Sequence, residues 1–255
     1  MVNPREHYDA LLAEHYTWML GGDVETLAAS DKHFLRTLGL DGGRLAVDLG
    51  CGPGPQTYAL SDLGFTDVVG VDTSRQLLEE LEANVGERTG IRTVQDDLLT
   101  ALPEILHGGT ADAVVCMRDT LLHLPDRETV TTLFAEVRSA LSPGGSFVLT
   151  YRDMSTPLAG LDRFLPTRSD SHRIMMCVLD YPDDDTAIVN DLVHIWNGSE
   201  WELHKSSYPK LRLSSDWVTN QLRAAGLDVR HHALGQDGMW TTVGTVETGK
   251  EHTIS

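Results

Sequence analysis

Three glycines at alternate positions, Gly50, Gly52 and Gly54, follow directly after the short apolar run 45–49. Glycine lets a ligand approach the main chain closely, because no Cβ atom stands in the way. Pro55 suits the first turn of a helix, where a missing N–H costs nothing. A buried strand, a glycine turn and a helix start therefore predict a cradle for a nucleotide-like ligand.

A carboxylate follows at the end of the next apolar run. Residues 67–71 predict a second buried strand, and Asp72 stands at its end, twenty-two residues beyond Gly50. An acid at this place can accept hydrogen bonds from both hydroxyls of a ribose. Pro55 occupies the position where a dinucleotide-binding turn needs a small residue, which argues against a nicotinamide cofactor.

Polar residues after two later apolar runs could act on a substrate. His123 follows the run 111–117, and its unperturbed pKa suits a general base; the alternative is a half-buried histidine bonded to a loop carbonyl. Asp119 could orient His123 or bind an amine. Arg152 could hold a substrate carboxylate, or it could pair with Asp153.

Strands and helices alternate regularly from residue 43 onward. Strands are expected at 45–49, 67–71, 91–95, 111–117 and 146–151, with helices at 55–63, 74–85 and 127–141. This alternation predicts an α/β fold with a doubly wound, mostly parallel sheet. Because ligands bind at the carboxyl ends of such strands, the polar residues named above should meet at one edge of the sheet.

Two helices are predicted ahead of this core, at residues 4–20 and 24–38, where apolar residues recur with helical spacing. They would form an N-terminal helical lid over residues 1–40. Tyr8, Tyr16 and Trp18 in the first helix could present ring faces to a cationic ligand at the glycine turn, or they could pack against the core.

An antiparallel β insertion is predicted after the fifth strand, over residues 154–212. The β-rich runs 174–181, 187–196 and 201–211 are separated by turn sequences and not by helices. We expect this insertion to fold over the active site as a substrate cap. Tyr208 could contact an anionic or aromatic substrate there, or its basic stretch could be an edge strand protected by lysine. A helix and a hairpin over residues 213–246 follow.

The order of these motifs resembles the class I S-adenosylmethionine-dependent methyltransferases, in which five parallel strands are completed by a helix and a final antiparallel hairpin. The resemblance covers about residues 40–153 and 212–246 and implies a seven-stranded sheet with S-adenosylmethionine as cofactor. The cofactor-binding residues that it implies are Asp48, Gly50, Gly52 and Gly54 at the glycine motif, Asp72 at the ribose, Asp96 or Asp97 at the adenine, and Met117 and Arg118 at the methionine end. The stretch 141–145, L-S-P-G-G, matches the family's turn before the fifth strand.

This resemblance implies one methyltransferase domain over residues 1–255, with a lid (1–40), a cofactor-binding core (41–153), a substrate cap (154–212) and a C-terminal helix and hairpin (213–246). It implies methyl transfer to an oxygen or nitrogen of a small molecule. His123 and Asp119 would then be the catalytic candidates, Tyr16 would face the sulfonium, and Trp18, Arg152 and Tyr208 would contact the substrate.

Two alternatives remain open at this point. The chain could bind S-adenosylmethionine without methyl transfer, as a cyclase or a regulatory binder, or it could be a nicotinamide oxidoreductase, which Pro55 opposes. A metal site is not expected, because Asp153 is followed by Met154 and not by the asparagine of the magnesium-dependent members.

The composition restricts the partners. A formal net charge of −18 predicts a surface that repels nucleic acid. Three cysteines at unrelated spacings indicate reduced thiols, without a disulfide framework or a zinc site. With no apolar run of membrane-spanning length and no apolar region of a signal peptide at the start, we expect a cytoplasmic protein that does not enter a membrane. The oligomeric state stays open, a homodimer included.

Overall fold

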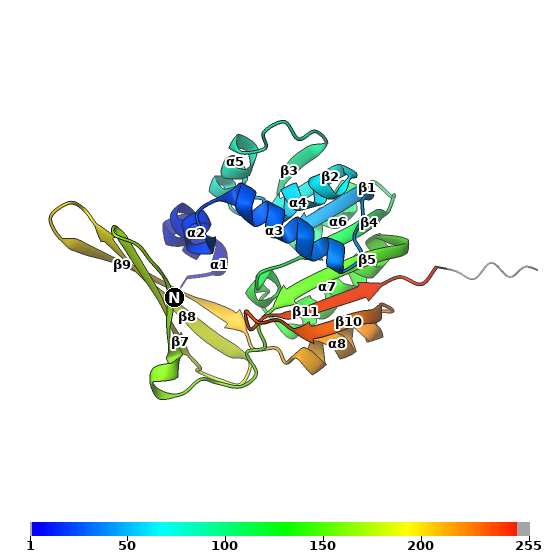
Figure 1. The fold of residues 1–255 in the computed structure, drawn as a ribbon. Helices are drawn as coiled ribbons and strands as arrows, with labels where there is room; N and C mark the ends of the chain where they lie inside the picture. Colours follow the sequence, from blue (N-terminus) through cyan, green and yellow to red (C-terminus); the bar gives the residue numbers. More distant parts are fainter. Residues whose placement is uncertain (1, 249–255) are drawn as a thin grey trace, which may run out of the picture.

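The computed structural model describes residues 2–248, which form two β-sheets and the helices that pack on them (Figure 1). The helices are α1 (Pro4–His7), the π-helical turn η1 (Tyr8–Leu12), α2 (Ala13–Leu20), α3 (Val24–Thr37), α4 (Pro55–Leu63), α5 (Arg75–Ala83), α6 (Leu98–Leu106), the 3-10 turn η2 (Thr120–His123), α7 (Arg127–Ala140), the 3-10 turn η3 (Gly160–Arg163) and α8 (Ser215–Ala224). The strands are β1 (Gly43–Leu49), β2 (Phe65–Asp72), β3 (Ile91–Gln95), β4 (Ala111–Cys116), β5 (Leu141–Tyr151), β6 (Phe164–Ser169), β7 (Arg173–Asp180), β8 (Thr186–Trp196), β9 (Trp201–Leu211), β10 (Asp228–Leu234) and β11 (Trp240–Thr245).

The larger sheet has seven strands in the order β10-β11-β5-β4-β1-β2-β3. Strands β1 to β5 pair in parallel, and only β11 runs antiparallel to both of its neighbours. The doubly wound, mostly parallel seven-stranded fold is therefore confirmed. The chain order reverses at β1, which pairs with β2 on one side and β4 on the other. Ligands of open α/β sheets bind at such a switch point.

The apolar runs of the central strands are continuous because both faces of the sheet are covered. Val47 and Leu49 of β1 pack toward α6 and α7, whereas Ala46 packs toward α3 and α4. This alternation follows from the two-residue period of a strand. It also turns Asp48 toward α4, beneath the glycine turn, where its side chain is buried.

Two elements were not expected from the sequence, and a proline explains each omission. Helix α6 contains Pro103, which reads as a breaker, but Asp97 caps its start by accepting a hydrogen bond from the Leu99 N–H at 2.9 Å. Strand β6 contains Pro166, which sits at a register shift on the edge of its sheet, where a missing N–H is tolerated. The single helix expected over 4–20 is present, with the π-helical turn η1 within it.

The insertion after β5 forms a second, fully antiparallel sheet in the order β6-β7-β8-β9, which we call the insertion sheet. One face packs on the N-terminal helix: Met175 and Val193 form a buried cluster with Leu12 and Trp18. Figure 1 shows α1 and α2 lying between this sheet and the main body. The predicted β insertion is confirmed, with four strands in place of three.

Arg212 joins the end of the insertion sheet to the core. Its side chain is buried and donates to three main-chain carbonyls, those of Met154 at 3.1 Å, Ser155 at 2.7 Å and Asp183. These carbonyls belong to the segment that leaves β5 and to the turn before β8. One guanidinium therefore fixes both ends of the insertion.

Replacing Arg212 should loosen this attachment. Arg212→Met leaves three main-chain carbonyls without a donor, that of the buried Met154 among them, so we expect the free energy of unfolding to fall by about 3 kcal/mol in urea titrations. The matched control is Arg230→Met, because Arg230 is exposed and pairs only with Asp228. The control should change the same quantity by less than about 0.5 kcal/mol. If both variants changed the free energy of unfolding equally, Arg212 would not be the residue that attaches the insertion to the core.

Candidate functional site

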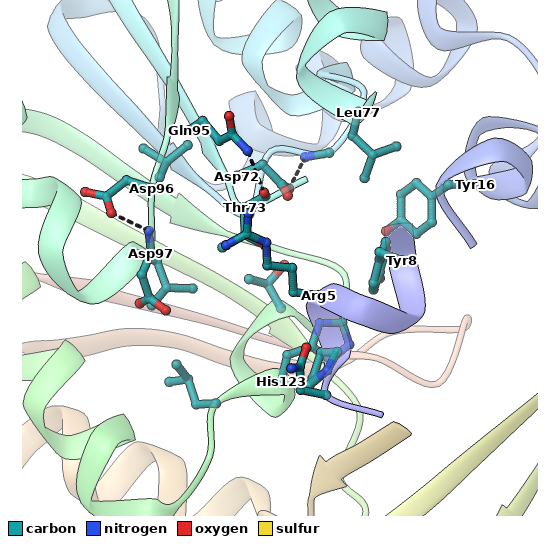
Figure 2. Close-up of a pocket in the computed structure, with 18 of the residues that line it drawn as sticks. Arg5, Tyr8, Tyr16, Asp72, Thr73, Leu77, Gln95, Asp96, Asp97 and His123 are labelled. Atoms are coloured by element: carbon teal, nitrogen blue, oxygen red, sulfur yellow. Dashed lines mark hydrogen bonds between the residues drawn. The ribbon is translucent and has the colours of Figure 1, made fainter. Parts of the chain in front are cut away.

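A cavity of about 710 Å³ opens at the carboxyl ends of β1, β2 and β3 (Figure 2). Its walls come from the glycine turn, the ends of β2 and β3, the loop after β4, and the N-terminal helix. Among the residues predicted for the site, Gly50, Gly52, Asp72, Asp96, Asp97, Tyr16 and His123 line it. The cavity has the size typical of small-molecule and cofactor sites.

The glycine turn is closed to any other residue type. Gly50 has φ +74°, and a Cβ atom there would lie 2.3 Å from the Thr120 side chain. Gly54 has φ +94° at the start of α4, and its Cβ would lie 2.5 Å from Leu81. Both positions need left-handed backbone and have no space for a side chain. The main chain of the turn is consequently bare toward the cavity.

Asp72 ends β2 with its carboxylate in the cavity, as Figure 2 shows. One oxygen accepts a hydrogen bond from the Gly52 N–H at 2.9 Å and the other from the Ser74 N–H at 2.8 Å. Each oxygen keeps a further lone pair. Burial raises the pKa of Asp72. The group can therefore accept two more hydrogen bonds from a ligand.

Asp96 and Asp97 both line the cavity beyond β3, so the alternative between them stays open. Asp97 is the N-cap of α6, which occupies one of its oxygens. Asp96 accepts hydrogen bonds from the Asp97 N–H at 2.7 Å and from the Thr100 hydroxyl at 2.9 Å. Each carboxylate is thus held in place and retains acceptor capacity.

Three residues predicted near the cofactor stand behind the cavity wall. Asp48 accepts a hydrogen bond from the Thr57 hydroxyl at 2.7 Å, and burial raises the pKa of Asp48 to about 7. Met117 is buried in the core. Arg118 has φ +55°, and its guanidinium pairs with Asp31 at 2.8 Å. Its Nη1 atom is buried and has no partner among residues 2–248.

Asp119 is buried and engaged by two cations. It accepts hydrogen bonds from Lys210 Nζ at 2.9 Å, from the Arg152 N–H at 2.8 Å and from the Arg152 guanidinium. Burial alone would raise the pKa of Asp119, but the charges of Lys210 and Arg152 outweigh it and hold the pKa well below its usual range. Asp119 does not line the cavity.

Arg152 pairs with Asp119 and not with Asp153, so the predicted Arg152–Asp153 pair is wrong. Asp153 instead accepts hydrogen bonds from the Ser155 N–H at 2.9 Å and the Ser215 N–H at 2.8 Å, which ties it to the start of α8. Arg152 lies outside the cavity wall. Its guanidinium neutralises Asp119.

His123 ends the turn η2, and its half-buried ring lines the cavity. Tyr8 and Tyr208 flank it with ring centroids at 5.7 and 5.6 Å. Burial, followed by the charge of Lys210, lowers the pKa of His123 to about 3. The expectation that His123 titrates near neutrality is therefore wrong. Its Nε2 atom is buried and has no partner within the described chain.

Of the four aromatic residues named from the sequence, Tyr8 and Tyr16 reach the cavity, and Trp18 and Tyr208 do not line it. Tyr16 lies against Tyr8, with ring centroids 5.6 Å apart. Trp18 faces the insertion sheet, and its indole N–H donates to Asp170 at 2.6 Å. Tyr208 is buried behind His123. No residue of the insertion is among those that line the cavity, so the insertion supports the wall without forming it.

The sequence analysis named Tyr8 but did not single out Arg5 or the contact of His7 with Asp191, which also shape this site. Tyr8 and Arg5 of the N-terminal helix line the cavity, and Figure 2 shows Arg5 reaching across it toward Thr73. Behind Tyr208, which stacks on His7 at 4.1 Å, the His7 ring contacts Asp191 at 2.9 Å, with both partners buried. The helical spacing of Tyr8 was a usable signal. The pairing of His7 with a residue 184 positions away was not.

Residues 46–145 match the family model of a methyltransferase domain. Curated relatives include the ubiquinone biosynthesis O-methyltransferase of Methylococcus capsulatus, 32% identical over 135 residues, which are 52% of this chain and 54% of that protein. A glycine/sarcosine N-methyltransferase of Halorhodospira halochloris is 33% identical over 134 residues, 51% of this chain and 48% of that protein. The chain thus spans about half the length of these relatives.

Solved structures extend the likeness of fold over nearly the whole chain. The CcbJ methyltransferase of Streptomyces caelestis superposes with a TM-score of 0.76 at 18% identity, covering 94% of this chain and 98% of that one. The amino pentose methyltransferase CalS10 of Micromonospora echinaspora, solved with bound S-adenosylmethionine, gives a TM-score of 0.72 at 18% identity and covers 92% and 96%.

The described residues contain no helix with the length and apolarity needed to cross a bilayer. Within the same range, no three His, Cys, Asp or Glu side chains are grouped so that they could hold a metal ion.

The half-buried, neutral His123 should make folding stability depend on pH. The folded chain keeps the ring neutral down to a pKa of about 3, whereas the unfolded chain takes up a proton below about 6.5. Protonation therefore favours the unfolded chain as pH falls, and the loss between pH 7 and pH 5 should be about 2 kcal/mol. Urea titrations at pH 7 and pH 5 measure this loss in the free energy of unfolding. The loss should be about 2 kcal/mol smaller in His123→Gln than in wild type. His204→Gln, at a half-exposed histidine, should follow wild type. Identical pH profiles for wild type and His123→Gln would contradict the neutral ring.

Proposed function

We propose that this chain, which belongs to the class I S-adenosylmethionine-dependent methyltransferase family, transfers the methyl group of S-adenosylmethionine to a small molecule, at nitrogen or oxygen. The observation that carries the proposal is one continuous cavity with two chemically different ends. The glycine turn forms the middle, because Gly52 donates to Asp72 and lies close to the Tyr16 ring. Asp72, Asp96 and Asp97 stand toward one end. Tyr8, Tyr16 and His123 stand at the other.

The first end fits the cofactor. Asp72 would accept the two ribose hydroxyls with its free lone pairs, and the bare main chain at Gly50 and Gly52 admits close contact. Asp96 or Asp97 would receive the adenine amine. When bound, S-adenosylmethionine supplies a sulfonium methyl whose thioether leaves uncharged.

The second end fits a neutral acceptor. Desolvation raises the pKa of the Tyr8 and Tyr16 phenols, so both hydroxyls remain protonated and can donate or accept hydrogen bonds. The Nε2 atom of the neutral His123 would accept an N–H of the acceptor and orient its lone pair toward the methyl group. Such alignment is a main source of rate in a displacement reaction.

Nitrogen suits this end better than oxygen. An alcohol must lose a proton to become a good nucleophile, and no described residue that lines the acceptor end is a free base of suitable strength. The pKa of His123 is too low, and Asp119 is neutralised by Lys210 and Arg152. An amine that enters as its free base needs no such group, because it already has its lone pair. We therefore infer an amine acceptor.

The domain roles follow from the same geometry. The N-terminal helices form the lid, since Arg5, Tyr8 and Tyr16 close the cavity, and the insertion sheet holds that lid from behind. The acidic net charge of −18 disfavours nucleic acid as the acceptor. A cofactor-binding protein without methyl transfer remains the second candidate, and the assays below separate the two.

Cofactor binding gives the first test. Asp72→Ala removes a charged acceptor from two ribose hydroxyls, so calorimetry should show S-adenosylhomocysteine binding at least about 100-fold more weakly. The control is Asp67→Ala at the opposite, half-exposed end of the same strand, which should bind like wild type. NAD should not bind to any of the three proteins. A folded Asp72→Ala protein with wild-type affinity would exclude the ribose assignment.

Methyl transfer gives the second test. Wild type should convert members of a panel of small amines, seen as a gain of one CH₂ in product mass with an equal yield of S-adenosylhomocysteine, while the matched alcohols react far more slowly. The value of kcat/KM should rise with pH through the pKa of the amine itself. His123→Gln should lower kcat/KM by about 10–100-fold without moving that pKa.

A rate limb near pH 6.5 in wild type that disappears in His123→Gln would instead make His123 the general base. Cofactor binding without any product across the panel would favour the second candidate.

A further inference from the structure

The two faces of the insertion sheet differ in what covers them. Along β8 the odd-numbered residues from Ala187 to Val193 are buried. Asp191 and Val193 contact the N-terminal helix, whereas Ala187 and Val189 pack into the main core. The even-numbered residues point the other way, and Figure 1 shows no element over them. We call this second side the outer face. By strand register it contains Phe164, Pro166, Ile174, Met176, Val178, Ile188, Leu192 and Leu203.

Exposed apolar side chains concentrate on this part of the molecule. Within residues 2–248 eight large hydrophobic side chains are exposed, and seven of them belong to the insertion. On the outer face Phe164 is 45% exposed, Ile174 40% and Leu203 48%. Trp201, which pairs with the even-numbered Trp196 and so lies on the same face, is 42% exposed, and the other three are Leu158, Leu161 and Leu165. Scattered exposed hydrophobics are ordinary, but a contiguous apolar patch marks an interaction site.

Three polar groups of the outer face, Asp180, Asn190 and Ser207, already have hydrogen-bond partners. Asn190 donates to the Asp180 carboxylate at 3.0 Å and accepts from the Ser207 hydroxyl at 2.7 Å. Asp180 also pairs with Arg163. Covering these groups would therefore leave few unmet hydrogen bonds, and this removes the usual penalty for burying a polar surface.

Charge indicates which partner fits. The outer face carries one acid, Asp180, and one base, Lys205, so it is electrically neutral on a chain with a net charge of −18. Two copies of this acidic chain repel each other over most of their surfaces. At the outer face that repulsion is absent, and a two-fold axis sets each copy's apolar strip against the same strip of its partner.

The dimensions also agree with a dimer. Four strands spaced about 4.8 Å apart, each with about eight residues at about 3.3 Å, cover roughly 500 Å² in projection. The solvent-accessible area of this face is larger than its projected area, because side chains protrude from the sheet. Stable interfaces remove about 800 Å² from each partner, and stacked sheets pack about 10 Å apart.

We propose that the outer face of the insertion sheet is the contact between two copies of this chain. Two insertion sheets stack face to face across a two-fold axis. The inner face of each sheet continues to hold the N-terminal helix, through the cluster of Leu12 and Trp18 with Val193. The dimer contact thereby stiffens the wall behind the cavity without contributing a residue to it.

Sedimentation velocity over a wide concentration range tests the interface. Wild type should sediment with twice the mass of one chain. Ile174→Glu combined with Leu203→Glu places like charges on both copies and should sediment with the mass of a single chain. The matched control is Leu234→Glu, at a 58% exposed leucine on β10 outside the sheet, which should remain a dimer. Calorimetric binding of S-adenosylhomocysteine checks that each variant is folded.

If the double variant does not fold, Leu203→Glu alone repeats the test, because Leu203 is half-exposed on the edge strand β9. This single substitution should raise the dissociation constant of the dimer at least about tenfold. A wild type that sediments as a monomer at every concentration would overturn the proposal. A folded double variant that remains a dimer would do the same, because the interface would then lie elsewhere. Flotation of a monomeric wild type with phosphatidylcholine vesicles would assign the face to lipid instead.

Discussion

The turn between β1 and α4 leaves no room for a side chain, and the rest of the site depends on how tightly it is packed. A Cβ atom on Gly50 would strike Thr120, the first residue of η2. The same turn gives the Gly52 N–H to Asp72. One close contact therefore sets the spacing between two walls of the cavity. The wall with Asp72 comes from β2, and the wall with His123 comes from η2.

The acceptor end is set by burial and by charge neutralisation. Three segments meet at His123: the turn η2, the N-terminal helix with Tyr8, and the insertion sheet with Tyr208. Together they remove the ring from water and keep it neutral. Asp119 stands beside this group, yet its charge is balanced by Lys210 and Arg152. The second end of the cavity is thus aromatic and uncharged, whereas the first end carries carboxylates.

Features that depend on local chain geometry could be predicted from the sequence. The parallel sheet, the glycine turn and the position of Asp72 at a strand end follow from strand period and backbone angles, and the structure places them as expected. The partners of the aromatic side chains could not be predicted from helical spacing alone. Trp18 shares a helix with Tyr16, but they point to different partners, because Trp18 meets Asp170 of the insertion.

The charge states could not be predicted either, since they arise from residues far apart in the chain. Lys210 approaches Asp119 from 91 positions away, and Asp191 approaches His7 from 184. No spacing rule connects such pairs before the insertion sheet is docked. Strand β6 and helix α6 were overlooked for a different reason, because each contains a proline. Pro166 is tolerated at a register shift on an edge strand, whereas Pro103 lies inside α6, a helix whose start Asp97 caps.

Strand β8 serves two surfaces at once, and this constrains how the protein can evolve. Its odd-numbered residues are buried, with Asp191 and Val193 against the lid, and its even-numbered residues form the outer face. Substitution can alter one surface while the other stays constant. Insertion or deletion of a single residue cannot, because every side chain beyond that point would exchange faces and the buried Asp191 would trade places with Leu192. The strand is free to drift in composition but is fixed in length.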